Sequence, residues 1–531
     1  MTRKRTTVPL PQDWDPQRAS EALQRSTFTY ACEVVTPLFG GGVKAGVVDA
    51  EMPVRATTIR GQLRFFWRLL NRQRFIHDGK VNFEDLFVEE RSIFGGLGNS
   101  GTIAASRIAV HISNVRNFGI GAAAKYSRRP DGNLKTLPDW EDWAGGQAVG
   151  YALFPAQGSA SRERIRVEPS LLARPGFRFD LSIDIDASLC GKKSGQVEEA
   201  VRWWASFGGV GARTRRGAGA VFVTFEDKSL VPVSREDAQS KGCTLVVQQT
   251  VFAKPVAAWS AAIAALQTFR QGVGLARESG NNNRPGRSRW PEPDAIRRIV
   301  GTNSPGHKPV YRADNWFPRA AFGLPIIFHF KDADAGDPHN STLHPVMADR
   351  MASPLVIRPY WNGSDWLAAA LLMPIEEPDQ LILAVDDAQH AVKTWPVDPR
   401  EQMVICDSFE PMSSYADDGV SDPLSVFLAY FAELGSTSTS SVNLSDVLPH
   451  QSNEQIWTGA QINQDKKNGS LTAKQMKKGR PSGSSAFAHA DDAEQLILQL
   501  PIGLQEKLKR NPITATAVVV DKTLIRIEVQ T

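Results

Sequence analysis

An α+β fold in two similar halves is predicted by the order in which strand-like and helix-like patterns follow one another. In the first half, residues 27–35, 102–115, 178–187 and 220–225 have strand patterns, and residues 57–74 and 197–205 have helical spacing. The order strand, helix, strands, helix, glycine-rich loop, strand is expected of a ferredoxin-like or RRM-like unit. A second cycle begins at residue 244, so the sequence predicts two such domains, fused and elaborated by insertions.

Length and composition agree with two large domains. The chain has 531 residues, 42% hydrophobic and 22% charged, which is typical of a globular protein. A polar stretch separates the cycles, and a Ser/Thr/Asn/Gln-rich stretch lies late in the chain. The predicted organisation is an N-terminal extension (1–26), a first domain (27–226), a linker (227–243) and a second domain (244–531) with a polar insertion at about 435–490.

The elements of the first half are justified by their side-chain patterns. Residues 27–35 are rich in β-branched and aromatic residues, and a glycine-rich loop follows them up to about residue 57. Residues 57–74 place apolar side chains such as Leu63 and Trp67 at helical spacing. Residues 178–187 alternate apolar and polar residues, which indicates a half-buried strand.

The second half is predicted in the same way. Residues 244–252 form a strand pattern and residues 255–269 an Ala-rich helix. Further strands are expected at 321–330, 355–359 and 366–373, a helix near 423–434, and a strand at 514–529 that closes the domain.

Charge, cysteine usage and hydropathy limit the class of protein. The formal net charge is only +4, but residues 52–77 contain six arginines and no acid, which suggests a local surface for anions, nucleic acid being the commonest large one. The four cysteines are far apart and form no zinc motif, as expected in a reducing compartment. Neither a secretory signal nor a membrane-spanning run is visible, so we expect a cytoplasmic protein without a membrane partner.

Arginines recur every four residues along the first predicted helix, at Arg60, Arg64, Arg68 and Arg72. They form one stripe beside the apolar face, with no acid in the same segment. Arginine binds phosphate oxygens bidentately, so the stripe indicates anion contact. The alternatives are a solvated face, or pairing with acids from elsewhere in the fold.

A glycine- and arginine-rich loop at 207–219 is the second basic feature. Its glycines allow close backbone approach, and its amide groups could converge on an anion beside Arg213, Arg215 and Arg216. The loop follows a helix and precedes a strand, which is opposite to the dinucleotide-binding order, and no P-loop motif is present. A nucleotide-binding enzyme of either class is therefore not expected.

These motifs together resemble the RAMP superfamily of CRISPR-associated proteins. The resemblance lies in the loop 207–219, in TPLFGGG at 36–42, in IRGQLRFFWR at 59–68 and in IFG at 93–95. FPRAAFGLP at 317–325 and MASPL at 351–355 are similar to the first RAMP subunit of the type III-B (Cmr) effector. The resemblance extends from about residue 27 to 360, and nothing after residue 435 contributes to it.

The resemblance implies two RRM-like RAMP domains in an RNA-binding subunit of an RNA-guided antiviral complex. Such a subunit lies near the 3′ part of the guide RNA and contacts guide RNA, target RNA and neighbouring RAMP (Cmr) subunits. No cofactor or metal is expected. The candidate RNA-binding residues are Lys44, Arg55, Arg60, Arg64, Arg68, Gly208, Gly209, Gly211, Arg213, Arg215, Arg216, Gly217, Gly219, Arg284, Arg287 and Arg289.

An enzymatic alternative rests on Asp49. In RAMP subunits that cut RNA, an aspartate in a loop of this kind supports metal-dependent cleavage, since a carboxylate can hold Mg²⁺. The first subunit of the effector is not thought to cut, and no second acid is near until Glu51, so a turn-forming aspartate is the favoured interpretation. A RAMP-type endoribonuclease that cleaves or processes RNA therefore stays the alternative to a non-enzymatic subunit.

Two further groups of residues are weaker candidates. Arg284, Arg287, Arg289, Arg297 and Arg298 surround Trp290, which offers an aromatic ring for base stacking. This segment fits RNA contact and docking on an acidic protein equally well. His339 and His344 with Asp332, Asp334 and Asp337 have the composition of a metal cluster but not the spacing of a known motif, so an acidic loop is expected.

Overall fold

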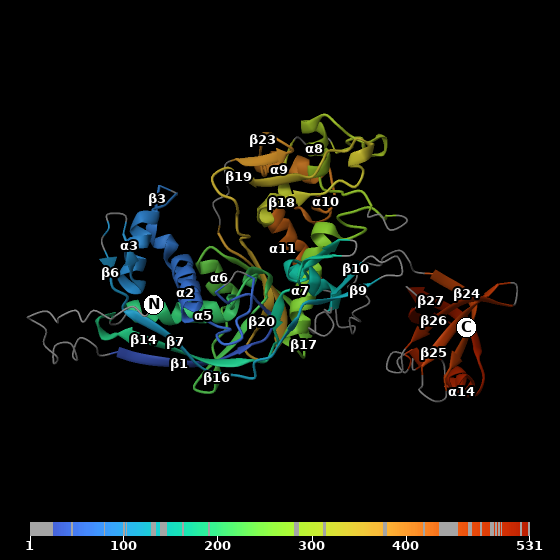
Figure 1. Cartoon of the computed structure of the whole chain (residues 1–531), viewed down its shortest axis with the longest axis horizontal. Coiled ribbons are helices and arrows are strands. Elements are labelled where there is room, and N and C mark those ends of the chain that lie inside the picture. Colours follow the sequence, from blue (N-terminus) through green and yellow to red (C-terminus); the bar gives the residue numbers. More distant parts are fainter. Residues whose placement is uncertain are drawn as a thin grey trace, which may run out of the picture. The chain divides into compact units, whose positions relative to one another are not determined.

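The computed structural model of the chain is shown in Figure 1. It describes residues 25–528 except 44–45, 79, 99–100, 102, 129–133, 139–145, 162–163, 190–191, 281–285, 312–314, 375–379, 418–419, 435–454, 466–469, 478–479, 489–492, 494–495, 498–499, 501 and 521–522. The chain divides into two compact units. Unit 1 comprises Met1–Ala276 and Ser288–Ser441, and unit 2 comprises Arg277–Arg287 and Val442–Thr531.

The first half of unit 1 is a five-stranded antiparallel sheet covered by two helices. Its elements are β1 (Arg25–Val34), α2 (Ala56–Asn71), β7 (Ile108–Arg116), β14 (Arg178–Asp186), α5 (Lys192–Phe207), β15 (Val221–Phe225) and β16 (Lys228–Ser229). The strand order is β16-β15-β1-β14-β7. The elements predicted for this half occur in the predicted order, with further helices and strands between them, and the α+β class is confirmed.

The alternating pattern of β14 explains which face of this sheet is covered. Phe179, Leu181 and Ile183 are buried in one core with Trp67 of α2 and Trp204 of α5. The two helices pack against each other above the sheet in Figure 1. The residues between the buried ones point to the other face, because successive side chains of a strand alternate.

A helix that the sequence analysis did not predict, α3 (Phe83–Phe94), packs on α2. Its N-cap is Asn82, whose side chain accepts a hydrogen bond from the Asp85 amide, and two acids lie in its first turn. The cap, together with buried Leu86 and Ile93, was a readable helix signal.

The second half of unit 1 contains β17 (Thr244–Phe252), α7 (Pro255–Gln271), β20 (Leu355–Trp361), β21 (Trp366–Leu372) and α11 (Pro423–Glu433). The strands pair in the order β17-β21-β20. Trp259 and Phe269 of α7 are fully buried in a core shared with Phe427 of α11. The predicted strand at 321–330 is shorter, β18 (Ile326–Phe328), because a 3₁₀ turn at Pro318–Phe322 precedes it.

A small sheet is inserted between α7 and β20 and extends past β21. It pairs β18, β19 (Ser341–Pro345), β22 (Leu381–Val385) and β23 (Ala388–Val392), and shares a core with α8 (Glu292–Val300). The remaining elements of unit 1 are β2 (Leu38–Phe39), β3 (Ile76–His77), β4 (Lys80–Val81), β5 (Gly96–Leu97), β6 (Ile103–Ala104), β8 (Ile120–Ala122), β9 (Ala124–Arg128), β10 (Leu134–Pro138), α4 (Gly146–Leu153), β11 (Ser159–Ser161), β12 (Arg164–Val167), β13 (Leu171–Ala173), α6 (Arg235–Ser240), α9 (Pro399–Cys406) and α10 (Met412–Tyr415).

The stretch expected to be a linker, 227–243, is a folded part of unit 1. It contains β16 and α6, and Val233 and Ala238 are buried in the core of the first half. Tyr360 and Leu371 of the second half enter that same core. The stretch is polar because most of it lies at the surface, while a few apolar side chains attach it to the core.

Unit 2 corrects the interpretation of the C-terminal region. The stretch expected to be a polar insertion, 435–490, contains β24 (Gln455–Gln464), β25 (Leu471–Lys477) and β26 (Arg480–Ala488). These strands form a closed barrel with β27 (Ile513–Val520) and β28 (Thr523–Glu528), and α14 (Ile502–Arg510) precedes β27. The strand expected to close the second domain is thus part of this barrel. The polar composition suggested an insertion without a core of its own because many side chains inside the barrel are alanines, which give only a weak hydrophobic pattern.

Candidate nucleic-acid interface

The arginine stripe of α2 has its countercharge inside the fold. Glu90 of α3 is almost fully buried, and its Oε1 accepts hydrogen bonds from Arg64 Nε and Arg68 Nη1, both at 2.6 Å. The other two stripe arginines donate to backbone carbonyls, Arg60 to Phe94 and Arg72 to Pro374. For Arg64 and Arg68 the observed arrangement is therefore pairing with an acid from elsewhere in the fold.

Two arginines at the N-terminal end of α2, Arg55 and Arg60, are also engaged within the protein. Burial lowers the pKa of Arg60, and the neighbouring charge of Arg64 lowers it further. Arg55, at the start of α2, donates from Nε to the carbonyl of Gly41 at 3.0 Å and so ties the helix to the first glycine loop. These arginines hold α2, α3 and the glycine loop together.

The glycine-rich loop, 208–219, packs against the protein itself. A Cβ on Gly217 would lie 2.6 Å from the Trp259 ring, and one on Gly211 would lie 2.6 Å from the carbonyl oxygen of Phe39. Both glycines have positive φ, at 74° and 83°. Amides that already donate to carbonyl oxygens are those of Gly208, Val210, Ala212, Arg216, Gly217, Ala218 and Gly219. These amides are engaged within the protein, and the glycines, Gly209 included, allow close packing of the loop.

The arginines of this loop gather with two others that the sequence analysis did not single out. Arg270 of α7 and Arg350 exert electrostatic effects on Arg216 and Arg213, respectively. We call Arg213, Arg215, Arg216, Arg270 and Arg350 the loop arginine cluster. Among the described residues, none of the five has a carboxylate within ion-pair distance, so the cluster is an uncompensated positive region in unit 1.

The members of the cluster differ in how firmly the fold holds them. Arg216 donates to the carbonyls of Phe322 and Leu355, and Arg215 donates to that of Ser353 and lies over the Phe65 ring. Burial lowers the pKa of Arg216 to about 10, and its arginine neighbours add to this effect. A carbonyl supplies no full negative charge, so the positive charge of these side chains is not neutralised.

Arg213 and Arg350 are the exposed members of the cluster. Neither has a side-chain hydrogen bond or an ion pair with any described residue. Arg213 has a left-handed backbone conformation, with φ 64°, and loss of water around its side chain lowers its pKa, as does the charge of Arg350. Two neighbouring guanidinium groups without an acid are the arrangement that an incoming polyanion would stabilise.

The outward face of the first sheet has the opposite character. Asp180 and Asp184 of β14 lie on it, paired with Arg116 and His111 of β7, and Glu33 of β1 pairs with Arg178. These carboxylates repel phosphate, and their positive partners are already engaged. The loop arginine cluster is thus a better candidate than this sheet face.

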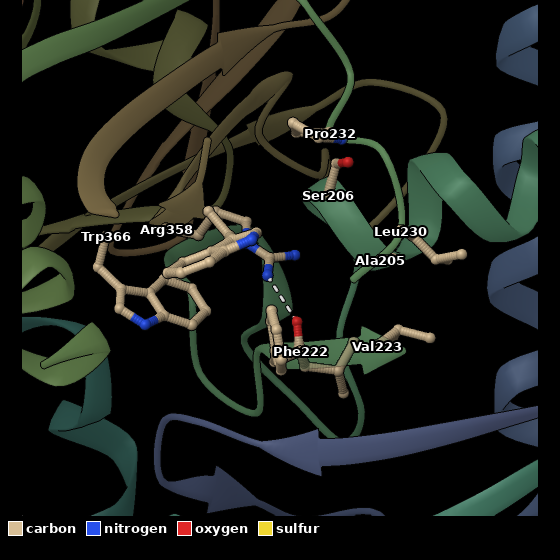
Figure 2. A pocket seen from close by; sticks show the side chains of 10 residues that line it. Ala205, Ser206, Phe222, Val223, Leu230, Pro232, Arg358 and Trp366 are labelled. Atoms are coloured by element: carbon tan, nitrogen blue, oxygen red, sulfur yellow. Dashed lines mark hydrogen bonds between the residues drawn. The ribbon is translucent and has the colours of Figure 1, made fainter. Parts of the chain in front are cut away.

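The pocket shown in Figure 2 contains a further arginine that the fold uses fully. Arg358 of β20 is 2% exposed and donates to the carbonyls of Gly208, Val221 and Pro359. Burial lowers its pKa to about 9. The rest of the pocket is mostly apolar, with Phe222, Trp361 and Trp366 in mutual ring contact.

The second basic segment is dispersed in the structure. Trp290, expected to be available for stacking, is fully buried against Phe269 and Phe409. Arg289 donates to the carbonyl of Gly274, and Arg298 to that of Tyr311. Arg287 is in unit 2, and Arg284 and Lys44 lie outside the described residues.

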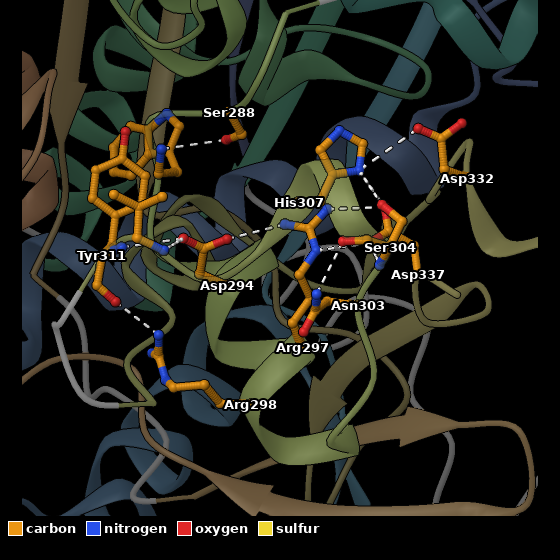
Figure 3. A network of polar contacts seen from close by, with 12 residues as sticks. Ser288, Asp294, Arg297, Arg298, Asn303, Ser304, His307, Tyr311, Asp332 and Asp337 are labelled. Atoms are coloured by element: carbon orange, nitrogen blue, oxygen red, sulfur yellow. Dashed lines mark hydrogen bonds and ion pairs between the residues drawn. The ribbon is translucent and has the colours of Figure 1, made fainter. Parts of the chain in front are cut away.

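Arg297 of α8 is the centre of a buried polar network, shown in Figure 3. It pairs with Asp294 at 3.0 Å and Asp337 at 3.1 Å, and His307 Nδ1 lies 2.7 Å from Asp337 Oδ2. Burial alone would raise the pKa of Asp337, but hydrogen bonds from Arg297, Ser304 and His307 lower it to about 2.

The histidine and acidic residues that resembled a metal cluster are only partly brought together. His307, Asp332 and Asp337 have ligand atoms within 4.8 Å of one another. His339 instead pairs with Asp386, and His344 contacts the carbonyl of Pro345. Because Arg297 already neutralises Asp337, this group is an ion-pair network of the fold.

Asp49 has the geometry of a turn residue. Its Oδ1 accepts hydrogen bonds from the amides of Glu51 at 3.0 Å and Met52 at 3.1 Å. It is not among the three residues that form the one metal-like group found in the described part of the chain. The turn interpretation of Asp49 therefore fits the structure.

Comparison with known families places the first half in a defined class. The sequence model of the RAMP superfamily matches residues 31–222, so the resemblance seen in the motifs is confirmed over this region. No characterised protein matches the chain in a search of curated sequences. No helix in the described part of the chain has the length and apolar character needed to span a membrane.

Solved structures give more distant similarities. The apo crystal structure of Cmr1 from Pyrococcus furiosus is 15% identical, with 72% of this chain and 97% of that chain covered, at a TM-score of 0.28. A chain from the type III-B Cmr-beta complex bound to cognate target RNA is 13% identical, with 74% and 99% covered, at a TM-score of 0.37.

Proposed function

We propose that this chain is a non-enzymatic RNA-binding subunit of a type III-B CRISPR RNA-guided interference complex in antiviral defence. The observation that carries the proposal is the loop arginine cluster, which has no described acid partner and lies at the end of a RAMP superfamily domain. Guanidinium groups read phosphate and sugar without regard to base identity.

In this proposal the chain contacts the backbone of guide and target RNA, near the 3′ part of the guide, and neighbouring RAMP subunits. Base pairing between guide and target then supplies sequence specificity, while the protein supplies affinity and shape. The position near the 3′ part rests on the motifs shared with the first Cmr RAMP subunit. Two fused RRM-like domains in unit 1 belong to the same proposal.

The test uses purified full-length chain and labelled single-stranded RNA in a salt series. Arg213→Glu/Arg350→Glu should weaken binding at least about tenfold at 0.1 M salt and lower the slope of log affinity against log salt by about 2. Both side chains are exposed and without described partners, so the variant should keep its unfolding midpoint.

A matched control separates local from general charge effects. Lys254→Glu/Arg400→Glu makes the same change in net charge at two other exposed positions. If this control weakens binding as much as the cluster variant does, the cluster is not the interface. Cleavage of the RNA that requires Mg²⁺ and is lost in Asp49→Ala would instead favour the endoribonuclease.

A further inference from the structure

The barrel of unit 2 has a specific connectivity. Its strands pair in the order β24-β25-β26-β28-β27, and β27 also pairs with β24, which closes the barrel. β26 and β28 are parallel, and every other pair is antiparallel. In chain order this is 1-2-3-5-4, with α14 between the third and fourth strands. These are the topology and helix position of an OB-fold.

The interior of the barrel is too full to hold a ligand. Ala460, Ala473, Ala486 and Ala517 face inward with larger residues such as Ile462 and Leu471, and all are buried. A five-stranded barrel has room inside only for its own side chains. Any ligand of this unit must therefore bind on the outer surface.

The outer surface of the first three strands carries polar side chains and Lys474. The register places Gln461, Lys474 and Ser485 in one row across β24, β25 and β26, and Asn463 and Thr472 in the next. Lys474 and Asn463 are exposed. Since these positions alternate with the buried residues, they are on the outside of the barrel.

The charge of these three strands differs from that of β28. The three strands contain Lys474, Lys477 and Arg480 and no acidic residue. Over residues 465–480, from the first connection to the start of the third strand, the sequence has six Lys and Arg against one Asp. β28, in contrast, carries one arginine and one glutamate.

We propose that the outer face of β24, β25 and β26 is a second site for single-stranded nucleic acid, separate from the loop arginine cluster. Two observations coincide there: the strand topology that presents strands 2 and 3 to oligonucleotides, and the sequence of those same strands, which contains lysine and arginine but no acid and places Lys474 exposed on the outer face. Amide and hydroxyl side chains supply hydrogen bonds, and the cations follow the phosphates. The chemistry suits RNA and DNA single strands.

The test uses the full-length chain, because the barrel is one part of it. Lys474→Glu/Lys477→Glu/Arg480→Glu should reduce affinity for single-stranded RNA or DNA by about tenfold or more at 0.1 M salt. Lys507→Glu/Lys509→Glu/Arg510→Glu makes the same charge change on α14, which packs on β24 and β27. This control should bind as the parent chain does.

Photocrosslinking makes the two proposed sites distinguishable. RNA with 4-thiouridine and DNA with bromodeoxyuridine, each crosslinked to the full chain, should attach to peptides within residues 455–488. These crosslinks should persist in Arg213→Glu/Arg350→Glu and disappear in the strand variant. Crosslinks from RNA alone, DNA alone or both support the site and identify its ligand.

The proposal is overturned if neither probe crosslinks within 455–488, or if the strand variant binds like the α14 control. Circular dichroism and the unfolding midpoint establish that both barrel variants are folded. A loss of binding only in Arg213→Glu/Arg350→Glu would support the function proposed above and reject the barrel site. The reverse result would support the barrel site alone.

Discussion

The arginine stripe of α2 and the loop arginine cluster differ in what neutralises them. Arg64 and Arg68 share one buried carboxylate, Glu90, whereas Arg213 and Arg350 have no acid partner among the described residues. In sequence, Arg213 resembled the stripe as an arginine without a neighbouring acid, whereas Arg350 directly follows Asp349. The difference teaches that an arginine motif predicts a position, while the presence of a countercharge decides between structural support and a free anion site.

The largest effect is expected when the stripe loses its countercharge. Glu90→Gln leaves Arg64 and Arg68 close together without an acid, so we expect a loss of roughly 2 to 3 kcal/mol in unfolding free energy. The unfolding free energy is measured by chemical denaturation of the full chain, with tryptophan fluorescence as the signal. A variant as stable as the parent chain would remove the distinction between the two arginine sets.

Arg297 belongs to neither set, and its pairing with Asp337 predicts how stability changes at acid pH. Because the pKa of Asp337 is about 2 instead of 3.8, its stabilising contribution is complete above pH 4 and is lost as the pH falls towards 2. The shift corresponds to about 2 kcal/mol. Asp337→Asn should therefore lower stability at neutral pH and flatten its decline between pH 4 and 2, whereas Asp334→Asn, at an exposed position, should leave both unchanged.

A single exposed arginine of the loop arginine cluster should affect RNA binding and not stability, which is the opposite of the response expected in the stripe. Arg213→Gln is expected to lower the salt slope of RNA binding by about 1 and to leave the unfolding midpoint unchanged. Arg64→Gln is the matched variant in the stripe and should change the midpoint more than the salt slope. If the two variants behave alike in both measurements, the comparison fails.

The smallest effect is expected at an exposed pair next to the stripe. Arg74 Nη2 lies 3.1 Å from Glu89 Oε1, and the arginine side chain is 45% exposed. Glu89→Gln should cost at most about 0.5 kcal/mol, because water screens exposed ion pairs. A cost equal to that of Glu90→Gln would mean that burial is not what strengthens the stripe.

The local elements of the first half were predictable from short-range patterns in the sequence. Apolar residues at helical spacing located α2, and the alternation along β14 located a strand with one buried face. The motifs also predicted the RAMP resemblance that the family match confirms for residues 31–222. These features depend on short-range periodicity and on residues close together in the chain.

The partners of the arginines and the C-terminal architecture became visible only in the folded chain. Glu90 reaches Arg64 from another helix, Arg350 approaches Arg213 across 137 positions of the sequence, and Trp290 is buried by residues far along the chain. The barrel of unit 2 was hidden because many of its inward residues are alanines, which give only a weak hydrophobic pattern. Long-range pairing of strands and charges leaves no local pattern, so it had to be observed.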